Sequence, residues 1–193
     1  MMGTGYLANP LIFIVQTLFQ LYILVVLLRF FLQLTRADFY NPLSQFIVKV
    51  TSPVLIPLRR LIPGMGGIDI ASLALAWALK TLELMLVLWY PKGSFTFFLP
   101  LLLAIPELVE LTINIFFWAI LIQAILSWIN PGTYNPASAL LYSLTLPVLR
   151  PAQRFIPPIG GIDLSPMVVM LGLVVLKMLI LPPLRSLAMA LAG

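Results

Sequence analysis

Three ionisable side chains interrupt long apolar stretches of the sequence, and they are its most unusual residues. Lys80 and Glu83 stand about one helical turn apart inside the stretch 70–89, and Lys177 stands inside the stretch 165–181. An unpaired charge at the centre of a membrane costs at least roughly 2.5 kcal/mol, and such residues are enriched in ion and proton paths. They can also be structural, with Lys80 bound to Glu83 and Lys177 extended towards the membrane surface. We expect the structural role, and an ion or proton path is the alternative.

The composition places these residues in a membrane protein. Of the 193 residues, 62% are hydrophobic and 9% are charged, whereas roughly a quarter of the residues of a soluble domain are charged. Four apolar stretches approach the roughly 20 residues that cross a bilayer, at 11–34, 70–89, 106–129 and 165–181. The first 28 residues carry no charge, so we expect the first span to be retained rather than removed as a signal peptide.

Prolines predict where several of the helices begin or end. Pro10 and Pro106 suit the first turns of the first and third spans, and the glutamates after Pro106 would then meet the positive end of that helix. The pair at 182–183 predicts the end of the fourth span. The short apolar stretch 95–105 is expected to form a separate interfacial or re-entrant piece.

A connector with a different pattern follows the first span. From Leu43 to Leu61, apolar residues recur at helical spacing and polar residues take the other face, which is typical of a helix lying in the membrane interface. Pro53 and Pro57 are expected to break this helix into two short pieces. The glycines that follow predict a turn.

The same connector occurs twice. A shift of 94 positions aligns residues 40–69 with 134–163 without a gap and gives 16 identities in 30 positions, many of them at Pro and Gly. Composition alone would not fix that spacing, so the chain contains a tandem repeat. The repeated polar and turn residues include Asn41, Pro42, Arg60, Gly66, Gly67 and Asp69 in the first copy, and Asn135, Pro136, Arg154, Gly160, Gly161 and Asp163 in the second.

The repeat also predicts topology. Each unit has two spans, so both units cross the membrane in the same direction and are related by a pseudo-two-fold axis along its normal. The connectors carry six basic residues and the opposite side carries two: Arg36, Lys49, Arg59, Arg60, Arg150 and Arg154 against Lys92 and Arg185. Because positive charge marks the cytoplasmic side, we expect cytoplasmic connectors and periplasmic termini.

The motif Tyr-Asn-Pro … Pro-Val-Leu-x-Pro-x-x-Arg-x-Ile-Pro-x-x-Gly-Gly-Ile-Asp resembles the YggT family, also called YlmG-like, of bacterial inner-membrane and plastid proteins. Both copies match, so the resemblance covers nearly the whole chain and implies the two-repeat form. The roles proposed for members of the family differ: osmotic or potassium tolerance, cell division, and cofactor assembly or nucleoid organisation in plastids. The resemblance supplies no catalytic residues.

Residues in and near the connectors admit two interpretations each. Asp69 and Asp163 are expected to cap the second and fourth spans, with cation binding as the alternative. Arg60 and Arg154 are expected to contact headgroup phosphates or these aspartates, rather than a partner protein. The glycine pairs predict turns, because the Lys-Ser/Thr of a phosphate loop does not follow them.

Two further expectations concern charges in the spans. Arg29 is expected to extend to the cytoplasmic interface, and a symmetric role is not expected because its counterpart is Gln123. Under the 94-residue shift Glu83 corresponds to Lys177, so these two opposite charges could instead pair across the pseudo-two-fold axis.

The sequence therefore predicts an all-α membrane protein of four transmembrane helices in two parallel repeats, at 1–94 and 95–193. Without Cys or His, the usual zinc sites and Ser-His-Asp chemistry are excluded, so we expect no enzyme, cofactor or metal site. The expected partners are anionic lipid headgroups and a membrane protein or second copy, with no nucleic acid. The expected function is a scaffold or assembly factor linked to osmotic homeostasis or cell division, with a small oligomeric channel or transporter as the alternative.

Overall fold

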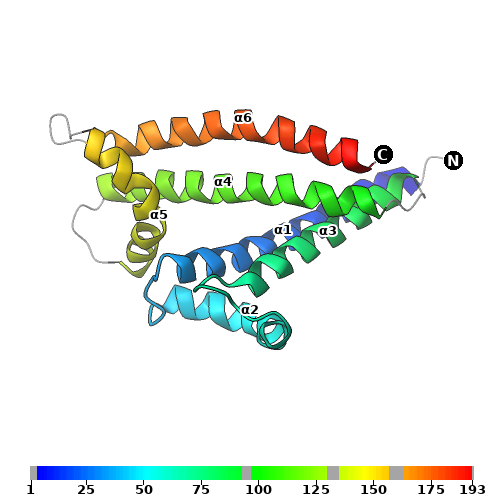
Figure 1. Cartoon of the computed structure of the whole chain (residues 1–193), viewed down its shortest axis with the longest axis horizontal. Coiled ribbons are helices and arrows are strands. Elements are labelled where there is room, and N and C mark those ends of the chain that lie inside the picture. The colour runs from blue at the N-terminus through cyan, green and yellow to red at the C-terminus, as the bar shows by residue number, and fades with distance from the viewer. Residues whose placement is uncertain (1–3, 93–96, 130–134, 157–162, 193) are drawn as a thin grey trace.

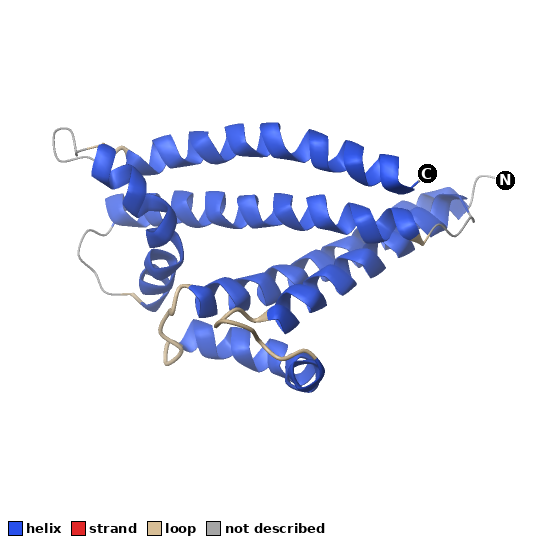
Figure 2. Ribbon diagram, in the orientation of Figure 1, coloured by secondary structure: helices blue, strands red, loops and turns tan. Residues whose placement is uncertain are grey.

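The structure, a computed structural model, describes residues 4–92, 97–129, 135–156 and 163–192. Within these ranges every regular element is a helix (Figure 2). The helices in chain order are α1 (Thr4–Leu34), α2 (Pro42–Leu61), α3 (Ile70–Lys92), α4 (Phe98–Ile129), α5 (Pro136–Phe155) and α6 (Ser165–Ala192). The all-α prediction is confirmed. The predicted boundary between repeats, at residues 94 and 95, lies outside the described residues.

Four of the helices are long and apolar enough to cross a membrane. They are Pro10–Leu34 in α1, Ile70–Leu88 in α3, Phe98–Ser127 in α4 and Ser165–Ala192 in α6, with mean hydropathies of 2.5, 1.7, 2.0 and 2.3. In Figure 1 both termini lie at one end of these helices, and α2 and α5 lie at the other end. The chain is therefore a multi-pass membrane protein with both connectors on one side.

Several helix ends differ from the sequence prediction, and prolines account for each difference. Pro10 and Pro106 lie inside α1 and α4 instead of starting them, and Pro182 and Pro183 lie inside α6 instead of ending it. The stretch from Phe98 to residue 105 is the beginning of α4, so it is not a separate re-entrant piece. Proline is tolerated in membrane helices because other groups of the protein bond the freed carbonyls.

The connectors form continuous helices, so the prediction that Pro53 and Pro57 break the first connector into two pieces is wrong. The second connector likewise contains two prolines within one helix. The helix is nevertheless not straight: in Figure 1 the first turns of α2 run beside the end of α1, and its later turns are seen nearly end-on. A bend is what a missing N–H and a ring clash with the preceding turn produce.

The main core lies where the first repeat meets α4 and α5. Buried side chains of α1, α2, α3, α4 and α5 pack together, among them Ile23, Val26, Leu27, Leu55, Ala71, Ala76, Ala119 and Leu144. The alanines allow close helix approach, which matters because van der Waals packing drives association in lipid. In contrast, α6 packs on α4 and α5 alone among the described helices.

The helix contacts depart from the pseudo-two-fold arrangement that the repeat suggests. The contact of α1 with α3 corresponds to that of α4 with α6, and the contact of α1 with α2 corresponds to that of α4 with α5. The contact of α3 with α4, however, has no counterpart between α6 and α1 within the described ranges. The four spans therefore do not close into a symmetric bundle, and α6 lies at its edge.

Substituted cysteines can test this arrangement directly, because the chain has none of its own. Lys49→Cys in α2, Arg150→Cys in α5 and Ala190→Cys in α6 each replace an exposed residue. We expect Lys49→Cys and Arg150→Cys to react with a membrane-impermeant maleimide from the same side of sealed vesicles, and Ala190→Cys from the opposite side. Reaction of the first two from opposite sides would contradict the fold.

Candidate functional site

Each span that precedes a connector holds the connector through one polar side chain. In the first repeat this residue is Arg29 of α1, whose guanidinium donates to the Thr51 hydroxyl at 2.6 Å, to Ser52 Oγ at 3.1 Å and to the Val48 carbonyl at 3.2 Å. Arg29 is 6% exposed. The side chain is therefore buried against the part of α2 just before Pro53 and does not end in open solvent.

The second repeat makes the same connection with a neutral residue. Gln123 of α4 is hydrogen-bonded to the hydroxyl of Thr145 in α5. These two residues are the counterparts of Arg29 and Thr51 under the 94-residue shift. The expectation that Gln123 has no symmetric role is wrong, since an amide reaches the same hydroxyl as a guanidinium.

A second attachment joins the end of the first connector to the start of α3. Asp69 is 4% exposed and accepts hydrogen bonds from Arg59 at 2.5 and 3.3 Å, from the Ser72 hydroxyl and from the Ser72 amide at 3.4 Å. The carboxylate thus caps the helix, as expected, and forms an ion pair. Because Arg59 and Ser72 occupy its oxygens, the cation alternative loses support.

Asp163 is held in the equivalent place, and Gln153, one of its two partners, is also equivalent. It accepts hydrogen bonds from the Ser165 amide at 2.8 Å and from the Gln153 side chain at 2.9 Å. Gln153 is the counterpart of Arg59, so an arginine is again replaced by a glutamine. Arg60 and Arg154, the expected alternative partners of the aspartates, are both exposed, and their neighbours Arg59 and Gln153 bind the aspartates instead.

The two aspartates differ in electrostatic setting. Burial raises the pKa of Asp69, but hydrogen bonds from Arg59 and Ser72 and the charge of Arg59 outweigh it and hold that pKa below its usual value. Burial also raises the pKa of Asp163, and hydrogen bonds from Ser165 and Gln153 more than offset it. Among these partners, only Arg59, which faces Asp69, carries a positive charge; Asp163 faces the neutral Gln153. The two attachments therefore have similar geometry but differ in charge.

The asparagines of the repeated motif begin the connector helices. The Asn41 side chain accepts from the Leu43 amide at 2.9 Å, and that of Asn135 accepts from the Ala137 amide at 3.0 Å, with Pro42 and Pro136 at the first helical positions. Asn41 also donates to the carbonyl of Pro136 at 2.7 Å and so joins the two connectors.

The predicted glycine turns can be followed in one repeat. Gly66 and Gly67 have φ angles of 61° and 82°, a left-handed conformation that glycine adopts without a steric cost. They lie in a turn closed by hydrogen bonds between Met65 and Ile68. Gly160 and Gly161 lie outside the described residues.

Lys80 and Glu83 form a closed pair. The Lys80 ammonium lies 3.0 and 3.1 Å from the two carboxylate oxygens of Glu83, and the side chains are 7% and 2% exposed. The proposed pairing of Glu83 with Lys177 is wrong, because α3 and α6 do not pack against one another in the described ranges. The structural interpretation of Lys80 and Glu83 matches the observed contacts.

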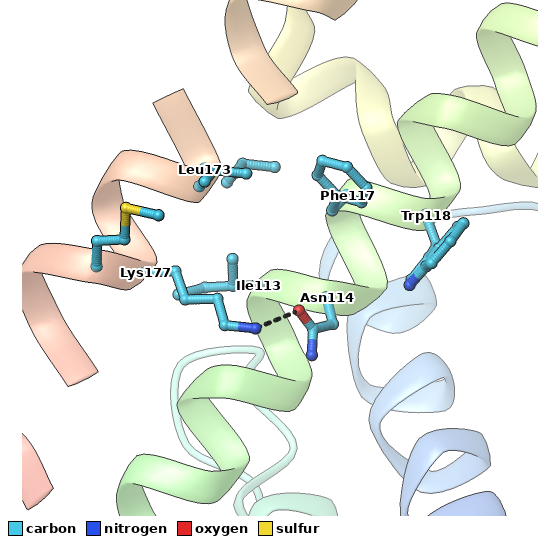
Figure 3. A pocket seen from close by; sticks show the side chains of 8 residues that line it. Ile113, Asn114, Phe117, Trp118, Leu173 and Lys177 are labelled. Carbon is cyan, nitrogen blue, oxygen red and sulfur yellow. Dashed lines mark hydrogen bonds between the residues drawn. The ribbon is translucent and has the colours of Figure 1, made fainter. Parts of the chain in front are cut away.

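Lys177 belongs to a separate polar cluster between α4 and α6. Its ammonium lies 2.7 Å from Glu110 and donates to Asn114 at 3.2 Å. Arg185 binds Glu110 as well, and binds Glu107 at 2.9 Å. Glu107 and Glu110 were predicted to lie at the start of a helix that begins at Pro106, but they bind Lys177 and Arg185 instead. Lys177 therefore does not extend alone to the membrane surface. Figure 3 shows the Lys177 amine directed at Asn114 across a pocket between the helices.

The sequence matches the profile of a known family over both repeats. The profile of the CCB3/YggT family matches residues 8–90 and again residues 102–184. The chain belongs to this family. The two matched segments are offset by 94 positions, the shift that aligns the connectors, so the tandem repeat and the resemblance to YggT proteins are confirmed.

Relatives from several bacteria match along most of their length. The chain is 48% identical to an uncharacterized protein of Pseudomonas aeruginosa over 88% of this chain and 87% of the relative. It is 47% identical to an uncharacterized protein of Vibrio alginolyticus over 86% and 90%, and 43% identical to the protein YggT of Escherichia coli K12 over 88% of each. No solved structure gives a significant match.

The residues that attach the connectors were not predicted from the sequence, although one signal for them was present. Thr51 and Thr145 are identical between the repeats, and each lies 22 positions after the polar residue to which it is hydrogen-bonded. The partners at positions 29 and 123 differ in type, and so do those at 59 and 153. Identity between the repeats therefore marked the threonines and aspartates and did not mark their partners, whose residue types differ.

The equivalence of Arg29 and Gln123 predicts how the first attachment responds to substitution. We expect Arg29→Ala to destabilise the protein by about 1.5–3 kcal/mol, because Thr51 and Ser52 lose a charged donor in a buried place. Arg29→Gln should cost clearly less, since glutamine makes this bond in the second repeat. Thermal unfolding in detergent measures both, and an equal loss for the two variants would contradict the equivalence.

The lowered pKa of Asp69 predicts a dependence on pH. Its contribution to stability is fully present above the ordinary carboxyl pKa, near 4, and is lost as the pH falls through the lowered folded-state pKa. We therefore expect Asp69→Asn to lower the unfolding temperature at pH 7, and the deficit relative to the unmodified chain to shrink below about pH 4. Asp163→Asn is the matched control, and its deficit at pH 7 should be smaller because Gln153 carries no charge.

Proposed function

We propose that the chain is a non-enzymatic scaffold or assembly factor of the bacterial inner membrane. One contrast supports this proposal: the charged groups within the spans of α3, α4 and α6 pair with opposite charges inside the chain, whereas five basic groups of the connector side are exposed. The first set comprises Lys80 with Glu83, Lys177 with Glu110, and Arg185 with Glu107 and Glu110. The second set comprises Arg36, Lys49, Arg60, Arg150 and Arg154.

The connector helices present apolar side chains beside these charges. In α2 the exposed apolar residues include Leu43, Phe46, Val50, Val54 and Leu61, and in α5 they include Tyr142 and Phe155. The face of α2 that packs inward carries Ser44, Thr51 and Leu55. A helix with an uncovered apolar face and basic residues suits the boundary between acyl chains and anionic headgroups, where each Lys or Arg contributes about 1 kcal/mol.

This surface implies an orientation and a mode of action. Cytoplasmic connectors and periplasmic termini would place the basic residues against the anionic cytoplasmic leaflet. Held there by Arg29, Gln123 and the two aspartates, α2 and α5 would form a fixed platform for lipid and for a membrane-protein partner. The resemblance to YggT proteins connects such a platform with osmotic homeostasis or cell division.

A small oligomeric channel or transporter is the second candidate, because Lys80 and Glu83 are ionisable groups buried within a span. The contacts favour it less. Glu83 and Lys177 lie on helices that do not touch in the described ranges, and each has its own partner. A continuous polar path between them would need rearranged helices.

Ion flux separates the two candidates. The scaffold proposal predicts that purified protein in proteoliposomes passes K⁺, Na⁺ and H⁺ no faster than protein-free vesicles. Flux that appears with the unmodified chain and disappears in a folded Glu83→Gln variant would overturn the scaffold proposal and establish the channel.

Charge variants test the platform itself. We expect Arg60→Ala with Arg154→Ala to lower the fraction of anionic lipid retained by the purified protein several-fold, and to fail to restore growth of a deletion strain at high osmolarity. Arg60→Lys with Arg154→Lys should retain both properties if charge is what the surface supplies. Full complementation by the double alanine variant at normal expression would count against the platform.

A further inference from the structure

A pocket of about 350 Å³ lies between α4 and α6, apart from the connector platform. It is lined by Ile113, Asn114, Phe117, Trp118, Leu173, Val174, Lys177 and Met178. Most of the wall is apolar, and the side chains of Lys177 and Asn114 supply its polar part (Figure 3). Its volume is at the lower end of the roughly 300–1,000 Å³ typical of ligand pockets, which suits a single substituted ring.

The depth of the pocket limits what can enter it. Asn114 and Lys177 lie near the midpoints of Phe98–Ile129 and Ser165–Ala192. At about 1.5 Å per residue, Lys177 stands roughly 18 Å from the first residue of its helix, which is near the centre of a bilayer whose hydrocarbon core is about 30 Å thick. Trp118 and Met178 are 57% and 69% exposed, so the pocket opens sideways towards lipid.

The polar groups at the pocket offer unused donors. An ammonium has three N–H groups, and Lys177 directs two contacts at Glu110 and Asn114. Asn114 accepts from Lys177, and among the described residues its own NH₂ group has no hydrogen-bond acceptor. Unsatisfied donors are costly in hydrocarbon, so a ligand that brings acceptor oxygens is favoured.

The charge of the surrounding cluster determines the charge of the ligand. Lys177 and Arg185 are matched by Glu107 and Glu110, so the four ionised groups sum to zero. An anionic ligand would compete with Glu110 for Lys177 and leave that carboxylate with Arg185 alone. A neutral molecule with acceptor oxygens keeps the pairs intact.

The pocket is a property of the second repeat. Under the 94-residue shift, Asn114, Val174 and Lys177 correspond to Gln20, Lys80 and Glu83. In the first repeat Lys80 and Glu83 fill this region with a buried ion pair. Lys177 is instead one-third exposed, so the same framework is closed in one repeat and open in the other.

We propose that this pocket binds the ring of a lipid-soluble quinone. The ring is neutral and planar, resides within the hydrocarbon, and carries carbonyl oxygens that can accept from Lys177 and Asn114, while Phe117 and Trp118 offer aromatic surfaces for it. A phospholipid offers similar carbonyl oxygens, but its esters lie at the interface rather than at the depth of Lys177. Binding is all that is inferred, and no electron transfer is assigned.

Decylubiquinone is a suitable probe, with purified protein in phospholipid nanodiscs and bound quinone quantified after separation. We expect saturable binding of one quinone per chain. Val174→Trp, which fills the pocket and leaves its polar groups in place, should weaken binding at least tenfold, and so should Lys177→Met. Val175→Trp is the matched control, because this neighbouring residue is 46% exposed and does not line the pocket; its affinity should equal that of the unmodified chain.

Each outcome supports or overturns quinone binding at this pocket once gel filtration has shown that the variants remain folded. The proposal is overturned if binding does not saturate, or if Val174→Trp binds as well as Val175→Trp. It is also overturned if native mass spectrometry finds that the unmodified chain retains a phospholipid at this site in the presence of quinone and Val174→Trp does not. Loss of binding with Val174→Trp but not with Lys177→Met would overturn the assigned hydrogen bond.

Discussion

A polar side chain in hydrocarbon must find its partner within the protein, and the arrangement of this chain depends on that constraint. Water does not compete for Arg29, so its guanidinium takes the Thr51 hydroxyl and the Val48 carbonyl of the bent α2. This contact sets where the connector lies against the span. Asp69 then sets where the next span begins, because it caps α3 while bound to Arg59. Connector and spans are thereby fixed at two points in each repeat.

The two repeats satisfy this constraint with different chemistry. Thr51 and Asp69 keep their types in the second repeat, while the arginines that bind them become Gln123 and Gln153. A guanidinium adds charge and further hydrogen bonds, whereas an amide needs no counter-charge when it is buried. The geometry of the attachment therefore tolerates either side chain, and the first connector is the one held by charge.

The sequence was sufficient for the properties that depend on hydropathy and spacing. It was possible to predict the four spans, the tandem repeat and both connectors, because the length of an apolar stretch and the repeated Pro and Gly positions do not depend on how the helices pack. Helix ends could not be predicted, because Pro106 and Pro182 would mark a helix start and a helix end in water but are accommodated inside helices in lipid, where the backbone has no better alternative than the helix. The position of Arg29 could not be predicted for a related reason: its partner Thr51 lies 22 residues further along the chain, on another helix, and only the packing of α2 against α1 brings the two together.

The partner of Lys177 could not be predicted, because pseudo-symmetry relates positions and does not bring them together. Glu83 and Lys177 are equivalent, yet α4 lies between α3 and α6 in the order of contacts. Each charge therefore pairs within its own repeat, Glu83 with Lys80 and Lys177 with Glu110. The contact of α3 with α4 has no counterpart between α6 and α1 in the described ranges. The pair of Lys177 and Glu110 therefore lies at the open edge of the helices. The charges therefore form two separate sites instead of one shared site on the pseudo-two-fold axis. The site of Lys80 and Glu83 is closed by its own ion pair, whereas the site of Lys177 is accessible from the bilayer. Only the second can exchange a ligand without opening the core.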